Sequence, residues 1–157
     1  MWIAEIAERA ILSVTTSIDV TFRASRVDDE ELHQEERAMY PAMVIQAGGG
    51  STPGNTYTHY DVPVTITLAT SKSGDPKLKI LAGLEDDLRN VIDNGIAAIV
   101  TAFNLISANA GESWYLQGIS DIEGNPVEYE TPFDTQTQTL QKIATTMIFK
   151  VCGSFRA

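Results

Sequence analysis

The clearest constraint on the fold is the run YTHYDVPVTITLAT at residues 57–70. Apolar residues alternate there with small or hydroxylated ones, and the apolar set is Val62, Val64, Ile66 and Leu68. A period of two indicates a strand with one buried face. Pro63 lies inside the run and predicts either an edge strand or the start of regular pairing.

A second strand is expected just before this run, at MYPAMVIQ, residues 39–46. Between the two lies AGGGSTPGNT, residues 47–56, whose glycines, Ser, Thr, Pro and Asn predict a mobile loop. The pair therefore reads as a long antiparallel hairpin with a projecting tip. The loop lacks the GK[ST] ending of a phosphate-binding loop and leads into a strand, which argues against a nucleotide site.

Helices are expected in two places. Residues 2–18 carry apolar side chains at helical spacing, and Glu5, Glu8 and Arg9 fall off that stripe. Residues 77–93 carry a leucine-rich stripe, with Asp75 as a cap, Pro76 at the first position and Asn94-Gly95 as the stop. Residues 96–106 read as another helix, with a buried strand as the rival interpretation.

The last third of the chain predicts further strands. SWYLQGISDI at 113–122 and VEYE at 127–130 read as a hairpin around the turn EGNP, and residues 140–153 as a long strand. Residues 19–27 are ambiguous between a strand and a linker. Grouped helices and antiparallel strands predict one α+β domain over residues 1–157, with a β-sheet and a long hairpin packed against two or three helices.

Charge restricts the partners. The formal net charge is −10, which argues against binding nucleic acid through its phosphates. No Lys or Arg occurs from Asn90 to Gln141, while seven acids lie there. This segment predicts either a solvated acidic surface or one that repels DNA. The acidic segment 28–37 reads as a solvated loop or short helix, without the spacing of a calcium-binding loop.

Chemistry-bearing residues are sparse. The chain has two histidines, His33 and His59, and one cysteine, Cys152, with no metal-ligand spacing between them. Cys152 reads as buried, and Glu128 with Glu130 as an ordinary strand pair. We therefore expect no catalytic residues, cofactor or metal. Trp2, Trp114 and Tyr115 are either core residues or interface anchors. Glu5, Glu8 and Arg9 interrupt the apolar residues at the start of the sequence, so we expect no secretory signal there. We also expect no membrane span, because no uninterrupted apolar run approaches ~20 residues.

The layout resembles the tail terminator proteins of long-tailed phages, a family similar to minor tail protein U within the head-tail joining or neck group. The resemblance rests on WIAEIAERAILSV, YPAMVIQ, the polar glycine-rich loop, HYDVPVTITLAT, LKILAGLEDDLRNVID and IATTMIFKV, in that order. It covers nearly the whole chain, and no single diagnostic motif carries it.

The resemblance implies a structural virion protein rather than an enzyme, assembled in the host cytoplasm as a homo-oligomeric ring, most simply a hexamer. Such a ring caps the tail tube protein, stops polymerisation and meets a head-completion or neck protein while DNA passes through unbound. We expect subunit contacts at Gly48, Gly49, Gly50, Thr52, Pro53 and Asn55, and channel-facing acids at Glu123, Glu128 and Glu130. The alternatives are a head-closure or neck connector and, in a different class, a small cytosolic ligand-binding or enzymatic domain.

Overall fold

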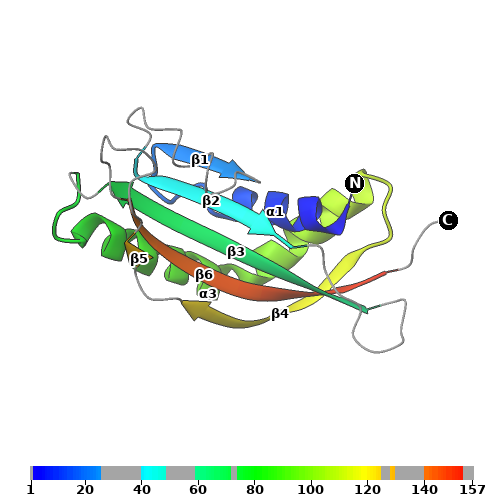
Figure 1. Cartoon of the computed structure of the whole chain (residues 1–157). Helices are drawn as coiled ribbons and strands as arrows, with labels where there is room; N and C mark the ends of the chain where they lie inside the picture. The colour runs from blue at the N-terminus through cyan, green and yellow to red at the C-terminus, as the bar shows by residue number, and fades with distance from the viewer. Residues whose placement is uncertain are drawn as a thin grey trace.

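The computed structural model describes residues 2–25, 40–48, 59–71, 74–124, 128–129 and 140–153. Two helices and six strands lie in these ranges (Figure 1). In chain order they are α1 (Ile3–Val14), β1 (Phe22–Ser25), β2 (Ala42–Ala47), β3 (His59–Ser71), α3 (Lys79–Asn109), β4 (Tyr115–Gly124), β5 (Glu128–Tyr129) and β6 (Leu140–Cys152).

The strands form one mixed sheet in the order β1-β2-β3-β6-β4, with β5 also paired to β6. Only β1 and β2 are parallel, with Phe22 opposite Ala42, and the other neighbours are antiparallel. This confirms the α+β class and the β2–β3 hairpin, and it shows that the ambiguous segment after α1 contains a strand. The tip of the hairpin lies outside the described residues.

Pro63 does not mark an edge, because β3 lies between β2 and β6 in the middle of the sheet. The Pro63 carbonyl accepts a hydrogen bond from the N–H of Gly48 at 2.7 Å. A residue in an antiparallel strand points its N–H and C=O to the same side, so the missing N–H faces the end of β2. The register with β6 continues unbroken, with Pro63 opposite Ile148. Pro63 therefore marks where pairing with β2 begins, the other alternative that the sequence left open.

The helix α3 is one continuous helix of 31 residues, so the predicted stop at Asn94-Gly95 is wrong. Its buried stripe passes through that point, with Leu88 and Ile92 before it and Ile99 and Phe103 after it, all fully buried. The apolar burial on both sides outweighs the intrinsic cost of a mid-helix glycine, about 1 kcal/mol. The rival interpretation of residues 96–106 as a strand is also wrong.

Replacing Gly95 with alanine is expected to raise the free energy of unfolding by roughly 0.5–1 kcal/mol. Gly95 is helical, and a methyl group added there meets no atom within 4 Å. Urea unfolding of the two proteins measures the difference. If Gly95 ended a helix in the left-handed conformation, the same change would destabilise the protein.

The start of α3 is held by Asp75, as expected, although the helix begins at Lys79 rather than at Pro76. The Asp75 carboxylate accepts hydrogen bonds from the N–H groups of Ile80 (3.0 Å) and Leu81 (2.9 Å). Leu78, between Asp75 and Ile80, has a φ of 59°, in the left-handed region, and this interrupts the helical path two residues after Pro76. Asp75 thus caps from further upstream than an ordinary N-cap residue does.

Two polar side chains, those of Arg23 and Glu8, tie α1 to the sheet. Its C-terminal end is held by Arg23 of β1, whose guanidinium donates to the carbonyl of Thr15 at 2.6 Å and to that of Ile18. A cation is favourable at a helix C-terminus. Glu8, which the periodicity assigned to the outside, is 1% exposed and accepts a hydrogen bond from the N–H of Ala47 at 3.0 Å. The periodicity assigned Glu8 to the outside because it treats every charged residue as exposed. Here the buried carboxylate accepts a hydrogen bond from a backbone N–H.

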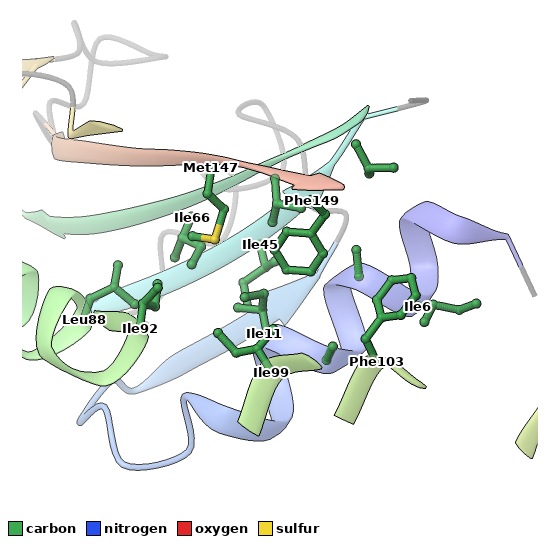
Figure 2. Packing of buried hydrophobic residues seen from close by; sticks show 14 of the residues in the cluster. Ile6, Ile11, Ile45, Ile66, Leu88, Ile92, Ile99, Phe103, Met147 and Phe149 are labelled. Atoms are coloured by element: carbon green, nitrogen blue, oxygen red, sulfur yellow. The ribbon is translucent and has the colours of Figure 1, made fainter. Parts of the chain in front are cut away.

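The core lies between the helices and one face of the sheet (Figure 2). Ile45, Ile66, Met147 and Phe149 point from the sheet toward side chains of α1 and α3, with Phe103 and Phe149 in edge contact at 6.2 Å between ring centroids. The opposite face carries a smaller cluster, Ala42, Val44 and Ala69 with Phe22 and Tyr40 packed against it. Nearer its centre, the hydroxyls of Thr65 and Thr146 lie 3.3 Å apart.

The predicted hairpin between the segments 113–122 and 127–130 is wrong. Both β4 and β5 pair with β6, and both run antiparallel to it. Tyr115 lies opposite Cys152 and Tyr129 opposite Gln141, so the chain keeps one direction along this edge of β6. β4 and β5 therefore do not form a hairpin with each other, because both run in the same direction along β6. Local turn chemistry does not specify which strand becomes the partner.

Candidate functional site

The predicted subunit-contact loop begins later than expected. Ala47 belongs to β2, and Gly48 continues the ladder through its bond to Pro63. A Cβ at Gly48 would come within 2.7 Å of Cγ of Pro63, so the close approach requires glycine. With Glu8 holding Ala47, the base of the loop is anchored to α1 and β3. Gly49, Gly50, Thr52, Pro53 and Asn55 lie outside the described residues.

Two of the three predicted channel-facing acids lie on strands that pair with the same edge of β6. Glu123 of β4 is opposite Thr146, just after a register shift that begins at Ser120, and Glu128 of β5 is opposite Lys142. Four residues of β6 separate these two positions, about 13 Å along a strand. Glu130 lies outside the described residues. The backbone thus places Glu123 and Glu128 along one edge of β6.

The structure brings together three side chains that sequence reasoning did not connect. His59, Cys152 and Tyr115 are opposite one another on β3, β6 and β4. Directly paired residues share a face of the sheet, and the next row on that face holds an ion pair between Lys150 and Asp61 at 2.9 Å. No motif could have shown this row, because its members come from distant segments.

This row contains a thiol beside an imidazole, the residue types of a nucleophile and its base. However, Cys152 is only 3% exposed, and its side chain shares a hydrogen bond with Tyr115. That hydrogen bond raises the pKa of the Tyr115 phenol, and the nearby Cys152 charge at alkaline pH adds to the rise. A buried thiol that is already hydrogen-bonded is poorly placed to attack a substrate, so we interpret the row as a structural contact.

The phenol of Tyr115 is expected to ionise above the ordinary tyrosine pKa of about 10. Because the pKa of Tyr115 is raised in the folded state, its protonated phenol contributes to folding stability below pH ~10. That contribution is lost as pH rises through the raised pKa. Ultraviolet titration of the protein against Tyr115→Phe isolates this phenol among the five tyrosines. Cys152→Ala should bring the pKa back toward 10, and a normal or lowered pKa in the parent would contradict the assignment.

The aromatic residues divide between the two expected roles. Trp114 is buried, in edge contact with Tyr60 at 5.4 Å and with Trp2 at 6.2 Å between ring centroids. Trp2 and Tyr115 remain about half exposed. Trp114 is therefore a core residue, and Trp2 and Tyr115 retain surface that a partner could contact.

Within the described ranges, no three His, Cys, Asp or Glu side chains are grouped as a metal site. In the part of the chain that the structure describes, one helix, α3, is long and apolar enough to cross a membrane by length and composition alone. No protein-family model matches the chain, and no curated protein matches it in sequence.

Proposed function

We propose that this chain is a ring-forming terminator of a phage tail, which caps the tail tube, stops its polymerisation and provides the head-joining surface. The observation that carries the proposal is the order of elements around one mixed sheet. The segments that resemble the terminator family fall on α1, β2, β3, α3 and β6, in the expected order. The glycine-rich segment stands between the two hairpin strands, as the resemblance implies.

The two edges of the sheet support ring formation. A closed ring needs two different surfaces on each subunit. Among the described residues, β1 lies at one edge and β4 at the other, and each pairs with a strand on one side only. Exposed strand edges can accept a strand from a neighbouring chain. The N–H of Leu116 in β4 already donates to the side chain of Asn104 in α3 at 2.8 Å. The part of β4 after Leu116 is therefore the better site for a strand from a neighbouring chain.

The test is the mass of the free protein and of the protein on tail tubes. Light scattering should give about six times the chain mass of 17.1 kDa at high concentration or after addition of purified tubes. A mass that stays monomeric in both conditions would rule out the ring. A crosslink to the tube protein would support a terminator. Crosslinks only to the head-completion protein would support a head-closure connector.

The loop provides a sharper variant. Fixing a glycine-rich loop costs about 1–2 kcal/mol per residue, which an interface can offset. Deleting Gly49 and Gly50 while keeping Gly48 spares the bond to Pro63, so the fold should persist and assembly should weaken. The control is a variant in which the loop is lengthened by two glycines. Deleting Gly83 or Gly95 is not a suitable control, because both lie within α3. Tails of normal length with the deletion variant would exclude a role for the loop.

The acidic edge gives a third test. DNA that passes through a ring should not adhere to it, and like charges reduce that contact over roughly 10 Å at 0.1 M salt. Replacing Glu123, Glu128 and Glu130 with lysine should leave the ring mass unchanged and make the ring retain DNA at low salt. Lysine at Asp86, Asp87 and Asp93 of α3 adds the same charge elsewhere. Equal DNA retention by both variants would show that the three acids do not face the channel.

A further inference from the structure

The outer face of the C-terminal half of α3 has no partner among the described residues. We define the outer seam as Asn94, Ala98, Thr101, Leu105 and Ala108, all of them exposed. Their spacing is four, three, four and three residues, the spacing of the contact seam in packed helix pairs. Leu105 is 60% exposed, the highest value among the large hydrophobic residues that the structure describes. The seam lies opposite the buried stripe that contains Ile99 and Phe103.

This part of the helix is also free of charge. From Asn94 to Gly111 the chain has no acidic or basic residue, although its formal net charge is −10. Two copies of an acidic chain repel each other, and contact is least opposed where neither carries charge. The outer seam is such a surface, and it suits a second copy better than a basic partner, which would favour the acidic faces.

Thr101 adds a detail that favours a dry contact. Its hydroxyl donates to the carbonyl of Ala97 at 2.9 Å, one turn earlier on the same helix. The polar atom is therefore satisfied within the helix, and covering Thr101 leaves no hydroxyl without a partner. Ala97 and Ala98 are small, so the large Leu105 side chain of another copy can fit against them.

The charges of the N-terminal half set the direction of the pair. Seven-residue steps backward from Asn94 reach Asp87 and Ile80, which are both exposed. A parallel pair would place Asp87 of one copy beside Asp87 of the other. An antiparallel pair that crosses near Thr101 separates these carboxylates and sets Leu105 of one copy against Ala97 and Ala98 of the other.

We propose that α3 pairs with α3 of a second copy, antiparallel, through the outer seam. Such a pair is symmetric and cannot by itself close a ring, so this inference does not rest on the proposed function. The seam is about 22 Å long, a small contact area, and the pair is expected to be weak and concentration-dependent.

A lipid surface is the rival occupant, because α3 passes the length and composition test for a membrane span. Crossing a membrane would require the buried stripe to leave the core. Leu88, Ile92, Ile99 and Phe103 are fully buried and point toward side chains of the sheet and α1 (Figure 2). Pulling them out would dismantle the domain, so the pair of helices is the interpretation that the fold favours.

The test uses single cysteines and a short bis-maleimide linker. In a Cys152→Ala background, Ala98→Cys should crosslink to its own copy. Ala82→Cys lies on the same helix about 24 Å away and should not. The parent chain, with only its buried Cys152, controls for background. Sedimentation of the parent should show a dimer that grows with concentration, and Leu105→Arg should weaken it by at least about tenfold, with Ala82→Arg as the matched charge control.

Four outcomes decide the matter. Crosslinking at residue 98 alone, lost in Leu105→Arg, supports the antiparallel pair. No crosslink and no dimer at any concentration overturns it, provided that circular dichroism shows a folded Ala98→Cys variant. Equal crosslinking at residues 82 and 98 overturns the antiparallel direction. Flotation of the parent with phosphatidylglycerol-containing vesicles, abolished by Leu105→Arg, overturns the pair in favour of lipid binding.

Discussion

Replacing Asp75 with alanine is expected to lower the free energy of unfolding by about 3–4 kcal/mol. The carboxylate is 3% exposed and caps two N–H groups of α3. It also accepts the hydroxyl of Thr70 at 3.3 Å, and that hydroxyl accepts from the buried amide of Gln141 at 3.2 Å. Without the carboxylate, the N–H groups of Ile80 and Leu81 and the hydroxyl of Thr70 lose this acceptor. An unsatisfied buried polar group costs about 1–3 kcal/mol.

Urea unfolding measures this effect, with two variants for comparison. Asp75→Asn keeps one acceptor oxygen and should fall between the parent and Asp75→Ala. Asp86→Ala removes an exposed carboxylate from the same helix and should change stability by no more than ~0.5 kcal/mol. A loss below ~1 kcal/mol in Asp75→Ala would mean that solvent or neighbouring groups satisfy the helix start.

Replacing Phe103 with alanine should cost about 3–5 kcal/mol. Its ring is fully buried and meets Phe149 of β6 edge to face, so truncation removes a large apolar contact and leaves a cavity. Thermal or urea unfolding measures the loss. Leu105→Ala, two residues further along α3 but 60% exposed, is the matched control and should change stability little. Similar losses for the two variants would place the buried stripe on a different side of the helix.

The alternating and helical periods predicted α1, β2, β3, β6 and both halves of α3 from the sequence alone. Periodicity succeeds there because one face of each element is buried and the other is not. It failed at Asn94-Gly95, where a local stop signal worth about 1 kcal/mol competes with the burial of Ile99 and Phe103. The sequence could not disclose the tertiary surface that supplies that burial.

Strand partners were the other limit. The pairing of β4 and β5 with β6, and the central place of β3, depend on contacts between distant segments. The row of His59, Cys152 and Tyr115 was hidden for the same reason. Glu8 was missed because its partner, the N–H of Ala47, is a backbone group that every residue type except proline carries. Residue patterns therefore predicted the elements better than the places where they meet.

The position of β6 in the sheet has a consequence for how the protein is made. β3 ends at Ser71, and its central partner β6 is completed only at Cys152. At 5–20 residues per second, a ribosome needs roughly 4–16 s for that interval. Until then, the edge of β3 that pairs with β6 is open, although β2 is already available on the other edge. Closing so distant a pairing slows folding further. The nascent chain therefore carries one unpaired edge of β3 until synthesis reaches β6.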